Sequence, residues 1–269
     1  MKVRVITAIV GILAVLALVW LGGWFLTSAI LAVALIALME YDRMLKNVSI
    51  HIYKKPSALA LALVIMASGF YSVKIFTAGI LLSFCFLLFL ILSITKEQMT
   101  DLIYTSFGVL YFGIGFGTLA FLRGSYELLP PGAVHMEPGI FLILFALIGT
   151  WASDSSAYLV GRRFGKHKMA PHISPNKTME GLFGGAAGCM ALGMIFSALV
   201  QYNLFHGFLL SLVAAVMAPV GDLFESYMKR ACDIKDSGNI LPGHGGMMDR
   251  FDSILFVAPA LEGILALLS

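Results

Sequence analysis

Long apolar runs, separated by short polar segments, make up most of the chain. Runs long enough to cross a bilayer as helices occur at 5–21, 24–40, 57–73, 75–94, 102–122, 139–161, 181–200, 204–228 and 251–268. One helical crossing needs about 20 apolar residues, and these runs lack the strict alternation of barrel strands. The pattern predicts an all-α polytopic membrane protein with about nine transmembrane helices.

Composition agrees with an integral membrane protein. Of the 269 residues, 59% are hydrophobic and 12% are charged, and the mean hydropathy is +0.92. A soluble globular domain carries about twice this charged fraction. The first run has no A-x-A cleavage site and a second run follows closely, so we interpret it as a retained helix. The lipid bilayer is the expected environment, and no nucleic acid partner is expected.

Positive charge orients the predicted helices. With a cytoplasmic N-terminus, all of the 18 lysines and arginines except Lys74 and Arg123 fall in cytoplasmic segments. Cytoplasmic loops are enriched in these residues, so the bias predicts a cytoplasmic N-terminus and an external C-terminus. The two largest late loops, 162–180 and 229–250, are then both cytoplasmic. We therefore divide the chain into N-terminal helices, 1–138, and a C-terminal part, 139–269, that gathers the polar chemistry on the cytoplasmic face.

A first polar constellation follows Trp151, in "SDSSAYLVGRR". Asp154 lies inside an apolar run, where a charge is costly. Helical spacing places Asp154, Tyr158 and Arg162 on one face. This face is either a structural Asp154–Arg162 pair or a ligand site at the end of the helix, and the spacing leaves both interpretations open.

The next loop combines basic and hydroxyl side chains beside a helix that we expect to start near Thr178. Its candidate ligand-binding residues are Lys166, Lys168, Ser174, Lys177 and Thr178. Basic side chains and helix N-termini favour anions, which suits a polyphosphate. The glycine spacing of a Walker motif is absent. Ordinary cytoplasmic loop charge explains the lysines but not the Ser-Pro-x-Lys-Thr cluster.

A glycine-rich face opens the following helix, in "GLFGGAAG". Gly181, Gly184, Gly185 and Gly188 include two small-xxx-small pairs, which are typical of close helix packing. The pattern fits packing within the fold or between two subunits, so a homodimer through this face is one expectation.

Two carboxylate pairs mark the second constellation, at 221–252. Asp222 and Glu225 are three residues apart on one predicted helix, and Asp249 and Asp252 repeat this spacing at the predicted start of the last helix. Clustered carboxylates repel one another unless a cation joins them, and oxygen ligands of this kind suit Mg²⁺. The pairs predict a Mg²⁺ site, with a second cation left open and with Asp154 as a further candidate ligand.

The segment between the pairs is rich in glycine. Gly243, Gly245 and Gly246 allow the backbone to approach a ligand closely, and His244 could donate to a phosphate oxygen. Pro242 and the glycines also fit a tight turn into the last helix, and a lone loop histidine is commonly incidental. Both interpretations stay open.

The stretch from Ser226 to Asp252 resembles the signature of phosphatidate cytidylyltransferases (CDP-diacylglycerol synthases). The matching residues are Ser226, Met228, Lys229, Arg230, Lys235, Asp236, Gly238, Pro242, His244, Gly245, Gly246, Met247, Asp249, Arg250 and Asp252. The upstream stretches "SDSSAYLVGRRFGKHK" and "ISPNKTMEG" are also similar to this family. The resemblance is specific from about 150 to 252, and the N-terminal half matches only in being apolar.

The resemblance implies an enzyme that makes CDP-diacylglycerol and pyrophosphate from CTP and phosphatidic acid, with a divalent metal and an active site facing the cytoplasm. In this interpretation Asp222 and Asp249 are the leading metal ligands, and Asp252, Glu225 and Asp154 follow. Lys229, Arg230 and Arg250 would hold the lipid phosphate or the leaving pyrophosphate. CTP would be held by the basic loop with Arg162, and by His244, Gly245 and Gly246.

Two other functions are weighed against this one. A CTP-dependent lipid kinase of the polyprenol or phytol type would transfer the γ-phosphoryl group and release CDP. An ion-coupled transporter would place coupling charges near the membrane midplane within internal repeats. The complete 226–252 signature favours the cytidylyltransferase over both.

The predicted orientation can be tested with a reporter fused to the C-terminus. A reporter that is active only outside the cytoplasm should be active in this position, because nine crossings from a cytoplasmic N-terminus end outside. Activity of only a cytoplasm-specific reporter would contradict the topology.

Overall fold

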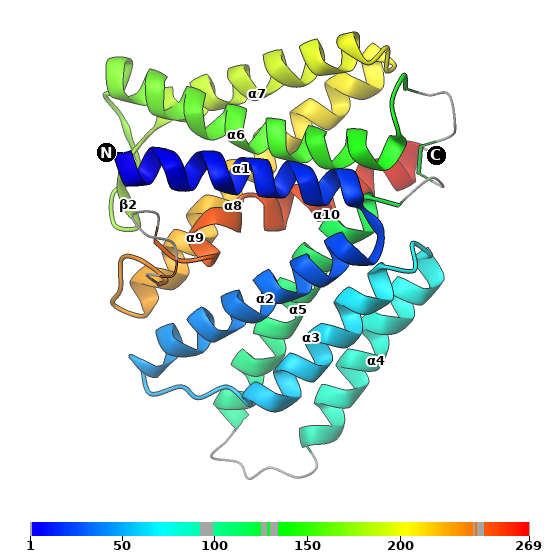
Figure 1. Ribbon diagram of the computed structural model, residues 1–269. Helices are drawn as coiled ribbons and strands as arrows, with labels where there is room; N and C mark the ends of the chain where they lie inside the picture. Colours follow the sequence, from blue (N-terminus) through cyan, green and yellow to red (C-terminus); the bar gives the residue numbers. More distant parts are fainter. Residues whose placement is uncertain are drawn as a thin grey trace. The chain divides into compact units, whose positions relative to one another are not determined.

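The computed structural model describes residues 2–91, 99–124, 128–129, 134–238, 240 and 245–268 (Figure 1). Its helices are α1 (Lys2–Leu21), α2 (Gly23–Lys46), α3 (Lys54–Ser68), α4 (Val73–Ile91), α5 (Met99–Leu122), α6 (Pro138–Phe164), α7 (Met179–Leu199), α8 (Leu204–Ala231), α9 (Met248–Phe251) and α10 (Ile254–Leu268). Two short strands, β1 (Lys168–Ala170) and β2 (Ser174–Thr178), lie between α6 and α7. The prediction of an all-α polytopic membrane protein is confirmed.

A helix lies in each of the nine predicted places. Seven helical segments of the described chain are long and apolar enough to cross a membrane, and α9 and α10 together, Met248–Leu268, count as one of them. Helix α3 and the described apolar part of α1 are shorter than this limit. The number of crossings and the orientation of the termini stay predictions. The chain separates into two compact units, Met1–Gly124 with Ala231–Phe251 and Ser125–Arg230 with Asp252–Ser269. The division of the chain into 1–138 and 139–269 is based on the positions of the polar residues, and it stays a prediction.

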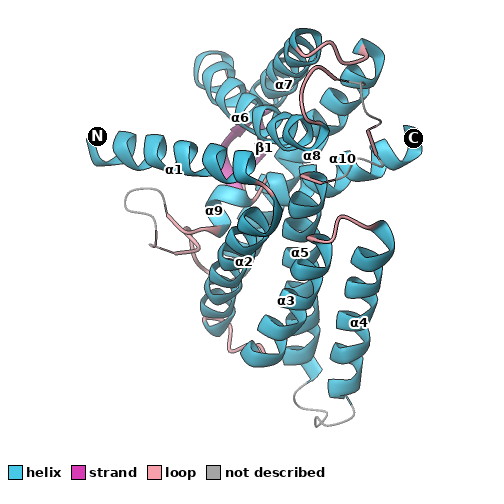
Figure 2. Ribbon diagram, turned by 45° about the vertical axis from the view of Figure 1, so that its right-hand side comes forward, coloured by secondary structure: helices cyan, strands magenta, loops and turns pink. Residues whose placement is uncertain are grey.

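The first unit contains a bundle of α2, α3, α4 and α5, in which α3 contacts the other three helices (Figures 1 and 2). Its core is aromatic, because Tyr41 of α2 packs edge-on against Phe112 of α5, with ring centroids 5.8 Å apart. Small residues bring α5 close to α3: a Cβ at Gly113 would lie 3.3 Å from Val64. The bundle therefore combines large aromatic side chains with positions where backbones approach closely.

Charged groups at the end of α2 join it to α3. The buried Asp42 carboxylate lies 2.9 Å from the Nζ of Lys46 and 2.9 Å from the Nζ of Lys54. Burial of a carboxylate is costly unless cations or hydrogen-bond donors accompany it. The two lysines meet this need, and the pairing fixes how the chain turns from α2 into α3.

In the second unit, α6 and α7 pack along the glycine face of α7. A Cβ at Gly185 would lie 2.9 Å from the backbone oxygen of Ser153, and one at Gly181 would lie 3.0 Å from that of Ala157. A side chain at either position would force the two helices apart. The glycine pattern therefore serves packing within the chain. A homodimer stays a prediction, and it would have to use a different surface.

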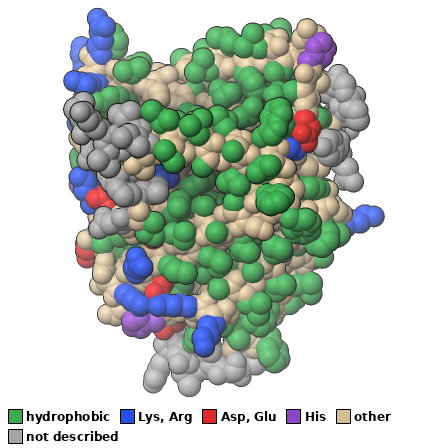
Figure 3. Space-filling view, viewed as in Figure 1, with side chains coloured by type: hydrophobic (Ala, Val, Ile, Leu, Met, Phe, Trp, Pro, Cys, Tyr) green, Lys and Arg blue, Asp and Glu red, His purple; other side chains and the backbone are tan. Residues whose placement is uncertain are grey.

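Apolar side chains cover much of the face seen in Figure 3, and the charged side chains lie mainly toward its edges. On α7, for example, Phe183 is 68% exposed and Leu199 is 76% exposed. So large an apolar surface is unfavourable in water and suits contact with lipid tails. The surface therefore agrees with an integral membrane protein.

Candidate active site

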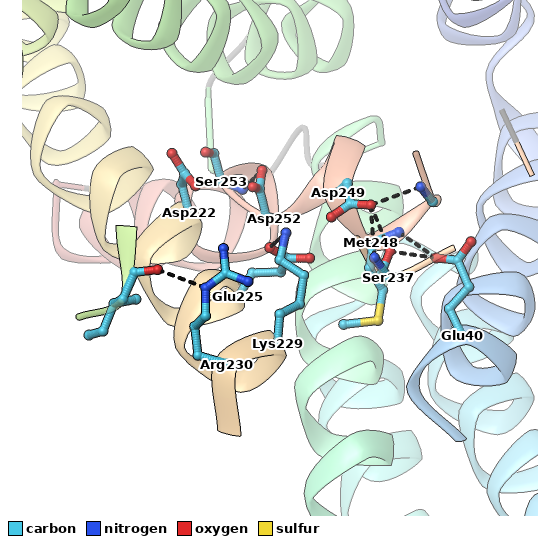
Figure 4. Close-up of polar contacts among 12 residues, drawn as sticks. Glu40, Asp222, Glu225, Lys229, Arg230, Ser237, Met248, Asp249, Asp252 and Ser253 are labelled. Atoms are coloured by element: carbon cyan, nitrogen blue, oxygen red, sulfur yellow. Dashed lines mark hydrogen bonds and ion pairs between the residues drawn. The ribbon is translucent and has the colours of Figure 1, made fainter. Parts of the chain in front are cut away.

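Two carboxylates of the second unit lie beside each other where α8 meets the start of α10 (Figure 4). Asp222 is on α8, and Asp252 is in the turn that precedes α10. Gly221 makes the approach possible, because a Cβ there would lie 2.5 Å from the backbone oxygen of Asp252. Asp252 is close enough to Asp222 and to Asp154 for their negative charges to repel its own. Three predicted metal ligands thus influence one another electrostatically.

One part of the predicted geometry is wrong. Asp249 is on the short helix α9, but Asp252 lies in a break between α9 and α10, where its Oδ1 accepts a hydrogen bond of 2.6 Å from the Ser253 amide. The two residues therefore do not share one face of a continuous helix. The helix breaks because the Asp252 side chain competes for a backbone donor that would otherwise serve the helix.

Basic side chains already neutralise the carboxylates of α8. Lys177, at the end of β2, places its Nζ 2.6 Å from Asp222 Oδ2. One turn further along α8, the Nζ of Lys229 lies 2.5 Å from Oε2 of Glu225, whose side chain is 1% exposed. Buried or half-buried charges need such partners. The predicted phosphate-binding lysine and a predicted metal ligand therefore contact each other directly.

The basic loop folds as a β-hairpin, which the sequence analysis did not predict. Strands β1 and β2 are antiparallel, with Lys168 opposite Thr178 and Ala170 opposite Ser174. The expected helix start is confirmed: Thr178 precedes α7, and its Oγ1 accepts a hydrogen bond of 3.1 Å from the Gly181 amide. Thr178 is thus a helix cap as well as a candidate ligand.

Both ends of the hairpin are anchored within the second unit. Glu180 accepts hydrogen bonds from the amides of Lys166 and His167, and its Oε1 lies 2.6 Å from Nδ1 of His167. Arg230 of α8 donates from Nε to the backbone oxygen of Ile173, near the hairpin turn, at 3.2 Å. These contacts hold the side chains of Lys166 and Lys168 at an exposed surface.

The predicted polar face of α6 is present. Arg162 donates to the hydroxyl of Tyr158 at 3.2 Å, and both side chains are exposed, as is Asp154. These residues lie on successive turns, as the i, i+4 spacing predicts. The face is therefore accessible to a ligand, and its use as a ligand site stays a prediction.

Asp249 belongs to the first unit, where its Oδ2 accepts three hydrogen bonds. The donors are the amide of Gly246 at 2.8 Å, and the amide and hydroxyl of Ser237 at 3.1 and 3.0 Å (Figure 4). Gly245 has a φ of 79°, and a Cβ there would lie 2.8 Å from Asp249 Oδ2. The glycines therefore serve close approach to a carboxylate of the chain itself, and their contact with a substrate stays a prediction.

The remaining predicted residues of this segment are Arg250, His244 and Gly243. Arg250 is on α9 with an exposed side chain. His244 and Gly243 lie outside the described residues. The roles proposed for them stay predictions.

Glu40 is a residue of this region that the sequence patterns did not identify. This residue lies on α2, is fully buried, and accepts hydrogen bonds from the amides of Met247 and Met248, both at 2.9 Å (Figure 4). A signal was available, because Glu40 is an acidic residue inside an apolar run, as Asp154 is. Its partners are more than 200 residues away, so no local pattern could identify them.

The residues of the second unit fit a magnesium ion in part. No group of three or more His, Cys, Asp or Glu residues is arranged as a complete metal site within the portion of the chain that the structure describes. Mg²⁺ does not require such a group, because it is commonly bound by one or two carboxylates together with water and phosphate oxygens. Asp222 and the adjacent Asp252 supply oxygen ligands of this kind, and their mutual repulsion favours a cation.

Comparison with known proteins gives a consistent result. The Cytidylyltransferase family matches residues 2–268. A phosphatidate cytidylyltransferase of Staphylococcus epidermidis is 37% identical over 270 residues, covering 98% of this chain and 99% of the relative. A phosphatidate cytidylyltransferase of Staphylococcus haemolyticus is 37% identical over 273 residues, with the same coverage. One from Staphylococcus aureus is 36% identical over 270 residues.

Proposed function

The chain belongs to the cytidylyltransferase family, and on this basis we propose that it transfers the cytidylyl group of CTP to phosphatidate. The products are CDP-diacylglycerol, the activated lipid from which phospholipids are made, and pyrophosphate. The observation that carries this proposal is the full-length similarity to proteins named phosphatidate cytidylyltransferase, combined with an uninterrupted signature from Ser226 to Asp252.

The chemistry is an in-line displacement at phosphorus. An oxygen of the phosphatidate phosphate attacks the α-phosphorus of CTP, the bond from that phosphorus to the bridging oxygen breaks, and pyrophosphate leaves. A phosphate monoester has a second pKa of about 6, so it is largely dianionic near neutral pH and needs no strong general base. The main barrier is the approach of two anions. Positioning and neutralisation of charge should therefore provide most of the catalysis.

Basic side chains of the second unit are suited to the phosphates. Lys166 and Lys168 are exposed on the hairpin, and Lys177 and Arg230 hold contacts within the protein. We assign the hairpin lysines to the CTP phosphates. Lys229, Arg230 and Arg250 are assigned to the lipid phosphate or the leaving pyrophosphate. Arg162, Ser174, Thr178 and His244 remain candidate ligands.

Asp222 and Asp252 are proposed to hold Mg²⁺, and Asp249, three residues before Asp252, stays a predicted ligand. Bound Mg²⁺ would neutralise phosphate charge at the reacting centre. The Nζ of Lys177 lies 2.6 Å from Asp222 Oδ2, in the position where a metal cation would be expected. If Asp222 held a divalent cation, Lys177 would be available to bind a nucleotide phosphate. This exchange of partners would couple metal and nucleotide binding.

The active site is proposed to face the cytoplasm, in the cytoplasmic membrane. CTP is a cytoplasmic nucleotide, and phosphatidate places its phosphate at headgroup depth. The concentration of lysine and arginine in loops 162–180 and 229–250 supports this placement.

The reaction can be tested with CTP labelled at the α- and γ-phosphates, supplied to the purified protein in phosphatidate-containing micelles. The α-label should appear in a CDP-lipid and the γ-label in pyrophosphate, and both should require Mg²⁺. A CTP-dependent lipid kinase would instead transfer the γ-label to the lipid and release CDP. That result would replace this proposal with the kinase interpretation.

Asp249→Asn should lower turnover by about 100-fold or more, because it removes a charge proposed to act on the metal. The amide oxygen can still accept from Gly246 and Ser237, so the variant should fold. Asp233→Asn is a matched control, since Asp233 is exposed in the same segment and its φ of 56° is tolerated by asparagine. Near-normal Mg²⁺-dependent turnover of Asp249→Asn would remove Asp249 from the metal site.

Lys177→Ala should raise the KM for CTP by about tenfold, the effect of one lost charge-assisted contact to a phosphate. Lys55→Ala serves as the control, because Lys55 is an exposed lysine of α3 with no role in the proposed site. Initial rates at varied CTP and saturating phosphatidate measure the effect. An unchanged KM would take Lys177 out of the nucleotide site.

A further inference from the structure

Glu40 makes contacts that are unusual for a side chain in an apolar helix. It is 0% exposed, its Oε1 accepts from the Met247 amide, and its Oε2 accepts from the Met248 amide. Oε2 also lies 3.2 Å from the hydroxyl of Ser237. Both oxygens are therefore used, and the partners are all in the signature segment.

The segment encloses this carboxylate closely. A Cβ at Gly238 would lie 2.6 Å from Glu40 Oε1, and a Cβ at Gly246 would lie 2.7 Å from Oε2. Both positions need glycine for this reason. Glu40 thus determines the local path of the backbone immediately before Asp249.

Ser237 connects Glu40 to Asp249. Its hydroxyl lies 3.2 Å from Glu40 Oε2 and 3.0 Å from Asp249 Oδ2, and it can donate its single proton to only one of them at a time. The Ser237 amide donates to Asp249 at 3.1 Å, whichever carboxylate receives the hydroxyl proton. The three side chains form one hydrogen-bonded chain within the first unit (Figure 4).

We propose that Glu40, acting through Ser237 and the Met247–Met248 amides, is a positioning residue that fixes the orientation of the Asp249 carboxylate. The inference rests on the proposed function for the role of Asp249 itself. Glu40 is not proposed to touch substrate or metal. Its effect is to hold Asp249 in one orientation before any ligand arrives, which reduces the cost of ordering the site on binding.

A carboxylate is needed because the two amides donate to two different oxygens. Glutamine has one acceptor oxygen and one NH₂ group, so in either orientation the NH₂ would face an amide hydrogen. Glu40→Gln therefore keeps the size and removes one of the two backbone contacts. It also leaves a buried donor without its acceptor.

A purely structural role is the competing interpretation, and Asp42 supplies the matched control. Asp42 is a second buried carboxylate of α2, two residues further on, and it is held by Lys46 and Lys54. Asp42→Asn should lower stability, as Glu40→Gln should. In the part of the chain that the structure describes, Asp42 shares no hydrogen bond or ion pair with the segment that holds Asp249.

The test compares full-length wild type, Glu40→Gln, Ser237→Ala and Asp42→Asn in phosphatidate-containing micelles. For Glu40→Gln we expect at least a tenfold fall in kcat and about a tenfold rise in the half-saturating Mg²⁺ concentration, with the KM for CTP changed less than about twofold. In the metal-free protein, the Ser237 amide, which donates to Asp249, should exchange hydrogen faster. Asp42→Asn should leave kcat and the Mg²⁺ requirement within about twofold of wild type, whatever its melting temperature.

Equal losses of kcat in Glu40→Gln and Asp42→Asn at equal losses of melting temperature would overturn the proposal, as would an unchanged Mg²⁺ requirement in Glu40→Gln. If Glu40→Gln does not fold, Ser237→Ala decides, because it removes one link and keeps both backbone contacts of Glu40. It should then raise the Mg²⁺ requirement severalfold, and no change would count against the proposal. Failure of the proposed function is distinguishable, since the wild type would then make no CDP-lipid, while the exchange of the Ser237 amide would still report on Asp249.

Discussion

The cost of burying charge among apolar helices is the constraint on which this structure depends. A charge within an apolar environment is tolerated only where hydrogen bonds or opposite charges surround it. Glu225 is met by Lys229 and Asp42 by two lysines, and the buried Arg123 donates from Nε to the Val19 oxygen at 2.7 Å. Glu40 differs, because backbone amides and a hydroxyl surround its carboxylate. A carboxylate held in this way fixes a backbone segment, whereas one held by lysines fixes side chains.

The same constraint shapes how a nucleotide could be bound. A site for phosphates needs cationic side chains, and a site for Mg²⁺ needs carboxylates. Before the ligand binds, either kind of charge is unfavourable in an apolar environment if it has no partner. In the second unit the two are paired with each other, as Lys177 and Asp222 show. Ligand binding would then exchange one ion pair for two new contacts. Such an exchange costs less than exposing either charge separately, because neither group is left without a partner.

Much of the helical fold follows from the sequence, because helix-forming apolar runs are local properties. The orientation that the charge bias predicts stays a prediction. The nine apolar runs and the start of α7 at Thr178 depend on residues within a few turns of one another, and the glycine spacing of α7 is local even though its partners lie on α6. The hairpin was missed because its strands have only three and five residues, too short for a periodic pattern. Glu40 was missed for a different reason. Its importance lies in partners about 200 residues away, and a single sequence does not pair distant residues.

Identical spacing also concealed a difference between Asp249 and Asp252. Both residues fit an i, i+3 pattern, yet one is oriented by three donors and the other lies near two further carboxylates. A carboxylate already surrounded by donors gains little from a cation at the bonded oxygen, while one repelled by Asp222 gains much. The environments therefore differ: Asp222 and Asp252 are proposed to supply charge that favours a cation, and Asp249, also a predicted ligand, is held in a fixed orientation by its donors. The break between α9 and α10 accompanies this difference, because Asp249 lies within α9 whereas Asp252 lies in the turn that follows it.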